Sequence, residues 1–131
     1  MTTITEAVKA ALDAYAPLQA LVGNGDSPET YRIHPILAPQ DTAKPFVVFH
    51  KVSGERLKTM ADSGGTGVEN MRYRISCYDE QIIDAQAVAD NVRKALAAAA
   101  TISAWHVFET DDYEIDTGLY HVTQDYSIWY K

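Results

Sequence analysis

The chain has 131 residues, of which 47% are hydrophobic and 22% are charged, and these values fit one globular domain with a modest core. The formal net charge of −7 argues against direct nucleic-acid binding through a broad basic surface. Cys77 is the one cysteine, which excludes an internal disulfide. The sequence has no apolar run of membrane length and no secretory signal. Together these features predict a protein that is made and used in a cytoplasm.

The N-terminal segment has the pattern of a short amphipathic helix. Thr3 and Glu6 form a T-x-x-E capping box, in which each side chain satisfies a free backbone N–H at the helix start. Apolar residues then recur at helical spacing, namely Ile4, Val8, Ala11, Leu12 and Tyr15. Pro17 cannot donate a helical hydrogen bond, so we expect the helix to kink or restart there and to continue only as a short turn.

The next part of the chain combines prolines, one apolar run and a long segment without periodicity. Residues 26–45 contain four prolines, which exclude a long helix or a central strand, although residues 31–33 could form a short edge strand. Residues 46–52 are apolar and β-branched, and they predict a central strand. Residues 53–67 contain four glycines and predict a loop, and a loop of this length in a small domain is usually functional or mobile.

Two alternating segments and a helix complete the chain. Residues 68–78 predict a strand with Met71, Tyr73, Ile75 and Cys77 on its buried face. An apolar stripe from Ile82 to Leu96 predicts a second helix, and residues 105–108 begin another strand. The last strand follows an acidic turn at residues 111–116; its buried face would carry Tyr120, Val122, Tyr126, Ile128 and Tyr130, and its other face His121, Thr123, Asp125, Ser127 and Lys131.

The order of these elements is α-β-β-α-β-β. It predicts an α+β fold in which two helices pack on a small mixed, mostly antiparallel β-sheet of about four to five strands. Residues 1–131 show no repeat or linker, so we expect a single domain.

Two patterns resemble ligand sites, but a solvated acidic turn is favoured for the first and a flexible hairpin loop for the second. Asp112, Glu114 and Asp116 alternate like the start of a calcium loop, yet the positions that need glycine and a bidentate acid hold Thr117 and Thr123. The Ser-Gly-Gly-Thr-Gly run at residues 63–67 resembles a phosphate cradle, but no Gly-Lys-Ser/Thr follows it.

The histidines and the cysteine give no catalytic pattern. His34, His50, His106 and His121 lie on separate elements without a metal-binding spacing. Cys77 alternates with apolar residues, which indicates a core thiol rather than a nucleophile. We therefore predict no catalytic residue, no metal site and no cofactor.

Arg72 and Arg74 project from the polar face of their predicted strand. They could pair with acids on a neighbouring strand or on a neighbouring subunit, and a solvated strand face is the alternative. The candidates for salt bridges between subunits are these two arginines with Asp112, Glu114 and Asp116.

Several short motifs follow one another along the chain in a fixed order. They are Tyr-Arg-Ile-His-Pro at 31–35, Pro-Phe-Val-Val-Phe at 45–49, Val-Ser-Gly-Glu-Arg at 52–56, Arg-Ile-Ser-Cys-Tyr at 74–78, Val-Ala-Asp-Asn-Val-Arg at 88–93, and Asp-Tyr-Glu at 112–114 with Thr-Gly-Leu-Tyr at 117–120 and Asp-Tyr-Ser-Ile-Trp-Tyr at 125–130. In this order and spacing, the chain resembles the tail completion, or tail terminator, family of long-tailed bacteriophages, prophages and gene-transfer agents over nearly its whole length.

The resemblance implies a structural protein of the virion and not an enzyme. It implies a homo-hexameric ring, assembled in the host cytoplasm, that caps the head-proximal end of the tail tube, stops tail polymerisation and joins the tail to the head connector. The expected partners are further copies, the tail tube protein and the head-connector protein, while DNA passes through the ring without specific binding. We expect no membrane among the partners.

The family's long loop commonly faces the ring interior or a neighbouring ring. In this chain the loop would be residues 53–67, with the candidate interface or lumen residues Ser53, Gly54, Glu55, Arg56, Lys58 and Asp62. A bore around DNA would gain from negative charge, so we expect part of the acidic excess there, either in this loop or among Asp111, Asp112, Glu114 and Asp116.

Two other classes of function stay open at this point. One is a small α+β ligand-binding or enzymatic domain that uses the scattered histidines and the acidic turn at 111–116. The other is an adaptor that pairs with its partner through the edge of its sheet.

Overall fold

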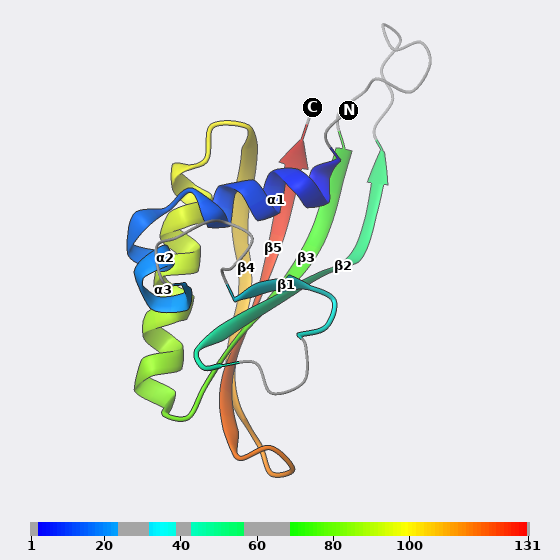
Figure 1. The fold of residues 1–131 in the computed structure, drawn as a ribbon. Helices are drawn as coiled ribbons and strands as arrows, with labels where there is room; N and C mark the ends of the chain where they lie inside the picture. Colours follow the sequence, from blue (N-terminus) through cyan, green and yellow to red (C-terminus); the bar gives the residue numbers. More distant parts are fainter. Residues whose placement is uncertain (1–2, 24–31, 39–42, 57–68, 131) are drawn as a thin grey trace, which may run out of the picture.

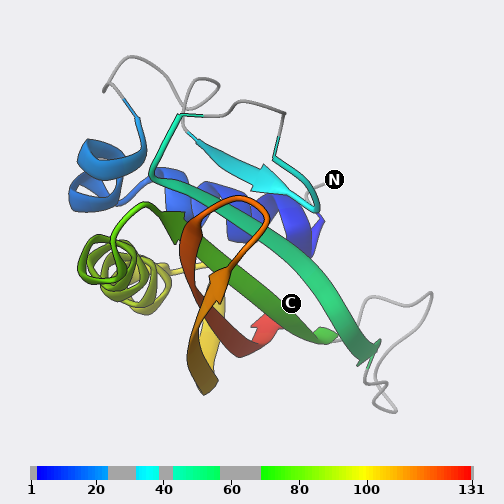
Figure 2. The same cartoon turned by 90° about the horizontal axis from the view of Figure 1, so that it is seen from below.

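A five-stranded sheet carries three helices on one of its two faces (Figures 1 and 2). The computed structural model describes residues 3–23, 32–38, 43–56 and 69–130. The strand order is β1-β2-β3-β5-β4, with β1 parallel to β2 and the other pairs antiparallel. The predicted α+β class and mostly antiparallel sheet are therefore confirmed.

The N-terminal helix begins as its sequence predicts. α1 spans Ile4–Asp13, and Thr3 is its N-cap. The Glu6 amide donates to Thr3 Oγ1 at 3.2 Å, and the Thr3 amide donates to Glu6 Oε2 at 2.9 Å, which completes the capping box.

The restart at Pro17 gives a separate helix rather than a short turn. α2 spans Ala16–Val22, with the proline in its first turn. Proline costs nothing there because the first amides of a helix have no partner within the helix. The described residues thus form three helices where two were predicted; the third, α3, spans Ile82–Ala98.

The first two strands differ in extent from the prediction. β1 spans Ile33–Pro35 and is the edge strand expected near this place, shifted by two residues. β2 spans Phe46–Arg56, so Ser53, Gly54, Glu55 and Arg56 belong to a strand and not to a loop. They extend the strand because they pair with residues 69–72 of the next strand, past a register shift between Lys51 and Ser53. Lys58, Asp62 and the rest of the predicted loop lie outside the described residues.

The remaining strands form the middle and the far edge of the sheet. β3 spans Glu69–Asp79 and β5 spans Leu119–Tyr130, both close to the prediction. β4 spans Ile102–Glu114 and is much longer than predicted, so Asp111, Asp112 and Glu114 lie in a strand and the turn is limited to residues 115–118.

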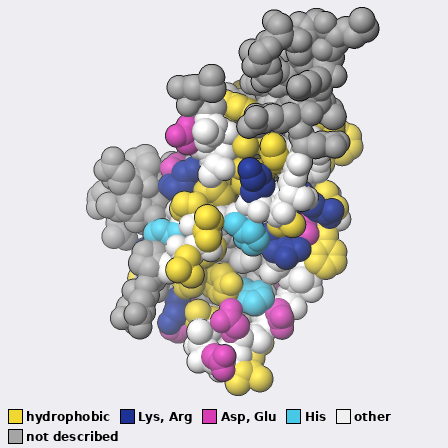
Figure 3. Space-filling model, turned by 90° about the vertical axis from the view of Figure 1, so that its right-hand side faces the viewer, with side chains coloured by type: hydrophobic (Ala, Val, Ile, Leu, Met, Phe, Trp, Pro, Cys, Tyr) yellow, Lys and Arg dark blue, Asp and Glu magenta, His cyan; other side chains and the backbone are white. Residues whose placement is uncertain are grey.

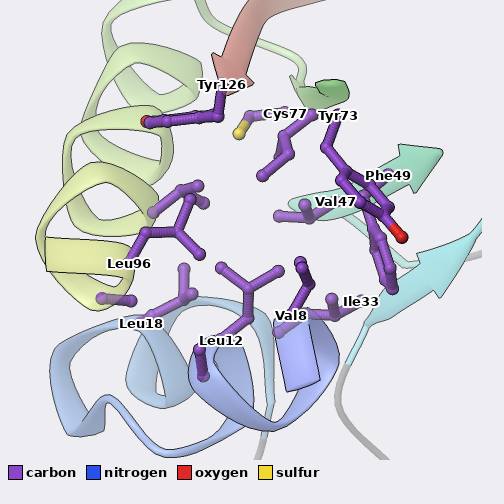
Figure 4. Packing of buried hydrophobic residues seen from close by; sticks show 14 of the residues in the cluster. Val8, Leu12, Leu18, Ile33, Val47, Phe49, Tyr73, Cys77, Leu96 and Tyr126 are labelled. Atoms are coloured by element: carbon purple, nitrogen blue, oxygen red, sulfur yellow. The ribbon is translucent and has the colours of Figure 1, made fainter. Parts of the chain in front are cut away.

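The core lies between the helices and the inner face of the sheet (Figure 4). Side chains from all three helices point toward Val47, Phe49, Tyr73, Cys77 and Tyr126 of the strands. The alternation predicted for β3 is confirmed, since Met71, Tyr73, Ile75 and Cys77 are all buried. For β5 it is confirmed at Val122, Tyr126 and Ile128, whereas Tyr120 and Tyr130 are only half-buried and Asp125, on the opposite face, is buried. Among the described residues, no helix is long and apolar enough to cross a membrane.

Gly54 is needed because β3 passes too close for a side chain. A Cβ at this position would lie 1.9 Å from Met71 Sδ, 2.9 Å from the Asn70 carbonyl oxygen and 3.0 Å from Met71 Cα. The Met71 thioether can move, but the two backbone atoms belong to the β2–β3 ladder.

We therefore expect Gly54→Ala to lower the free energy of unfolding by about 1–3 kcal/mol, the usual cost of overpacking. Urea denaturation measures the change, and Ser53→Ala is the neighbouring control, expected within about 0.5 kcal/mol of wild type. Equal stability of Gly54→Ala and wild type would contradict the close approach.

Candidate assembly surface

No described helix covers the second face of the sheet, which we call the outer face. Alternation along the strands places there the side chains between the buried ones, such as Arg72, Arg74, Asp125 and Trp129. In Figure 3, Lys and Arg side chains lie across the middle of this face, and acidic side chains gather at its lower end. An exposed sheet face of mixed character in a small domain is a candidate assembly surface.

Two arginines share one carboxylate in the middle of the outer face. Arg74 donates to Asp125 from Nε at 2.9 Å and from Nη2 at 3.2 Å, and Arg72 Nε lies 3.9 Å from the same carboxylate. Register explains the pair, because Arg74 of β3 stands directly opposite Asp125 of β5. The predicted pairing with an acid on a neighbouring strand is confirmed, and salt bridges between subunits stay a prediction.

The charges of this cluster do not balance. The hydrogen bonds from Arg74 hold the pKa of Asp125 below its usual range, and the same bonds raise the pKa of Arg74. Asp125 is only 5% exposed, whereas the Arg72 side chain is 45% exposed. Among the described side chains of this cluster, one half-exposed guanidinium is therefore left in excess.

Removing the shared carboxylate should destabilise the domain in a pH-dependent way. A folded-state pKa below the unfolded value means that the ionised Asp125 stabilises the fold above pH ~4, and that this contribution is lost as pH falls through the folded pKa. Asp125→Asn should therefore cost about 1–3 kcal/mol at neutral pH, since Arg74 is partly screened by solvent, and progressively less below pH ~4.

Urea denaturation at pH 7 and pH 3 measures this difference. The control is Asp90→Asn, because the partners of Asp90 are Arg93 and Lys94 on an exposed helix face and such pairs contribute about 0–1 kcal/mol. A cost for Asp125→Asn that does not shrink at pH 3 would contradict an ionic role for Asp125.

Beside the arginines, a groove crosses the outer face. Its apolar part, of about 560 Å³, is lined by Ser103, Trp105, His106, Val107, Ser127 and Trp129. A polar part of about 370 Å³ adjoins it, shares Val107 and Ser127, and reaches Arg72. We call the two parts together the outer groove; Trp105 is 65% exposed in it.

At the other end of β4 and β5, the hairpin tip combines acidic and apolar side chains. The tip comprises residues 111–118 and carries four acids, Asp111, Asp112, Glu114 and Asp116. Between the last two, Ile115 is 86% exposed. β3 ends where Asp79 pairs with Tyr120, so the tip extends past β3, as Figure 1 shows.

His121 is the basic group beside the tip. Its Nδ1 lies 3.5 Å from Glu114 Oε2, and its Nε2 lies 3.8 Å from Asp112 Oδ2. Its ring also meets Tyr78 edge to face, with the ring centroids 5.0 Å apart. One histidine thus stands among several carboxylates, and the tip keeps an acidic excess.

The residues examined for catalysis stay apart. Cys77 is fully buried, which raises the pKa of its thiol, so the interpretation as a core thiol is confirmed. Burial also lowers the pKa of His34. In the described ranges, no three His, Cys, Asp or Glu side chains lie close enough together to hold a metal ion.

The sequence analysis did not identify a buried polar contact between α3 and the sheet. Gln124 is fully buried; its Nε2 donates to the Ala89 carbonyl at 3.1 Å and to Glu109 Oε1 at 2.7 Å, and its Oε1 accepts from the Tyr126 hydroxyl at 3.0 Å. The sequence could have indicated this contact, because alternation places Gln124 on the inward face of the last strand, where a polar side chain needs hydrogen-bond partners.

The outer groove was also missed. Its two tryptophans lie between inward-pointing neighbours, such as Trp129 between Ile128 and Tyr130. Alternation alone therefore places Trp129 outside the core. Only the strand register shows that Trp129 and Trp105 come together, because Ser103 stands opposite Trp129 and Trp105 opposite Ser127.

Comparison with known proteins gives one family and a matching fold. The family model described as tail completion protein gp17 matches residues 6–131. A chain in a solved structure titled "Virion of native gene transfer agent (GTA) particle" is similar with a TM-score of 0.65 and 17% identity, over 94% of this chain and 90% of that chain. At this identity the likeness shows the fold alone. No curated protein matches the sequence significantly.

Proposed function

The chain belongs to the tail completion protein gp17 family, and from this premise we propose that it forms a hexameric ring at the head-proximal end of the tail tube. Family membership makes it a structural protein of the virion tail, which acts in tail assembly. In our proposal the ring stops polymerisation of the tail tube protein and joins the finished tail to the head connector. The match over residues 6–131 carries this proposal, because it includes every strand and nearly all of α1.

The surface of the domain supports an assembling subunit. β4 is the edge strand next to β5 and is exposed along most of its length, and the outer face carries exposed aromatic side chains. A long exposed edge and an uncovered aromatic face are features that a partner normally covers.

A structural role is favoured over an enzymatic one. The thiol of Cys77 is buried with a raised pKa, which is the opposite of an activated nucleophile. At the acidic tip, Asp112 and Glu114 lie on β4 and face His121 rather than forming a loop around a common point.

We also propose that part of the acidic excess faces the bore of the ring, where it would repel DNA phosphates. The candidates are Asp111 and Asp112 near the end of β4, together with Glu55 and Asp62. Glu114 and Asp116 flank Ile115 and are candidates for a contact between copies instead. A structure of the assembled ring with a neutral or basic bore would contradict this assignment.

Inactivation of the gene in its phage or prophage tests the proposed function. Without the protein, we expect tails of uncontrolled length that are not joined to heads, and full heads beside them, in electron micrographs. Complementation with the wild-type chain should restore a single tail length and joined particles. Normal tails joined to heads in the absence of the protein would overturn the proposal.

A further inference from the structure

We propose that, in the ring, the hairpin tip of one copy seats in the outer groove of the next copy. The inference rests on the proposed ring and names the two surfaces that would build it. Ile115 would enter the apolar part of the groove, and the carboxylates beside it would face Arg72 of the neighbour. The occupant of the groove is thus a second copy of this chain.

The tip has the chemistry of such an anchor. Ile115 is the most exposed of the large hydrophobic side chains that the structure describes, at 86%, and it stands in a turn with Glu114 and Asp116 on either side. An exposed aliphatic side chain between two acids gains from burial only where the receiving surface is apolar and carries positive charge nearby.

The outer groove has that composition. Trp105, Trp129 and Val107 form its apolar part, and Val107 also borders the part that contains Arg72. Asp125 is already held by two hydrogen bonds from Arg74, so among the side chains that the structure describes no carboxylate lies at hydrogen-bond distance from Arg72. Its half-exposed guanidinium can therefore take an incoming acid without giving up a strong bond.

Geometry requires that tip and groove come from different copies. Trp105 and Glu114 lie nine residues apart on the same strand, β4, which separates them by roughly 30 Å at about 3.3 Å per residue. A copy cannot fill its own groove along a continuous strand. If the tip of each copy enters the groove of the next in the proposed ring, the contact is heterologous, which is the kind of contact that closes into a ring.

Cysteine pairs test the contact in tails assembled with the variant chain. Ile115→Cys combined with Val107→Cys should give disulfide-linked multimers under mild oxidation, up to the full ring. Cys77 is buried with a raised pKa and should not take part. The control combines Ile83→Cys with Val107→Cys, because Ile83 is 75% exposed but lies on α3. We expect at least tenfold fewer multimers from the control, and also from either Ile115→Cys or Val107→Cys alone.

A charge exchange tests the ionic part independently. Arg72→Glu or Asp116→Arg alone should lower ring formation on tails at least tenfold, and the double variant should recover at least half of the wild-type level. Circular dichroism verifies that each variant folds. If Arg72→Glu does not fold beside Asp125, the cysteine pairs decide the question alone.

The outcomes separate this inference from the proposed function. Rings on tails, with no more cross-linking than the Ile83 control, would overturn the tip-in-groove contact and leave the ring standing. Absence of any ring on tails of the wild-type phage would overturn both.

Discussion

A chain that ends at Asp125 is expected not to fold. The deletion removes the second half of β5, which lies between β3 and β4 in the sheet and pairs with residues 69–73 and 102–106. It also removes Tyr126 and Ile128, which are at most 1% exposed. Burying each such side chain contributes about 1.5–3 kcal/mol, and small domains are stable by only about 5–15 kcal/mol in total.

Circular dichroism and urea denaturation of the purified chains measure this loss. The control is a chain that ends at Tyr130, which leaves β5 whole and should unfold cooperatively near the wild-type midpoint. A cooperative transition of the chain that ends at Asp125, within about 2 kcal/mol of wild type, would show that the end of β5 is not part of the core.

Tyr73→Ala is expected to lower the free energy of unfolding by about 3–5 kcal/mol, the usual cost of removing a buried aromatic ring. Tyr73 is fully buried at the centre of β3, and its ring centroid lies 6.5 Å from that of Phe49 on β2. Its hydroxyl and Thr5 Oγ1 are hydrogen-bonded at 2.6 Å, so the side chain also links the sheet to α1. The variant would lose packing and this link together.

Tyr73→Phe separates the two contributions, because it keeps the ring and removes the hydroxyl. We expect it to cost about 0.5–1.5 kcal/mol, the net value of a typical hydrogen bond. The two variants are compared by urea denaturation. If Tyr73→Phe were as damaging as Tyr73→Ala, the hydroxyl and not the packing of the ring would dominate.

Elements with one buried face could be predicted from the sequence, and this follows from the physics of burial. β3 and β5 alternate because their inner side chains enter the core, and α1 has both a capping box and an apolar stripe. β4 gave no such pattern, since it is an edge strand that is exposed along most of its length. The run of acidic residues at its end was therefore predicted as a turn. The end of β2 was predicted as a loop because Gly54 is typical of loops. In the structure this glycine is needed because Met71 and Asn70 of β3 lie too close for a side chain.

The candidate assembly surface depends on register, which local sequence patterns do not specify. Arg74 was correctly placed on the polar face, but its partner Asp125 is 51 residues away and is chosen by the pairing of β3 with β5. In the same way, Trp105 and Trp129 meet only because β4 and β5 pair as they do. The family, by contrast, could be identified from short motifs in order, and the match over residues 6–131 confirms it.

The most direct test of the account is an electron cryomicroscopy reconstruction of the head–tail junction in the assembled particle. The account predicts six copies of this chain in one ring between the last ring of the tail tube and the head connector. A reconstruction that places the chain at the opposite end of the tail, or that shows it there in a form other than a closed six-membered ring, would contradict the proposed function.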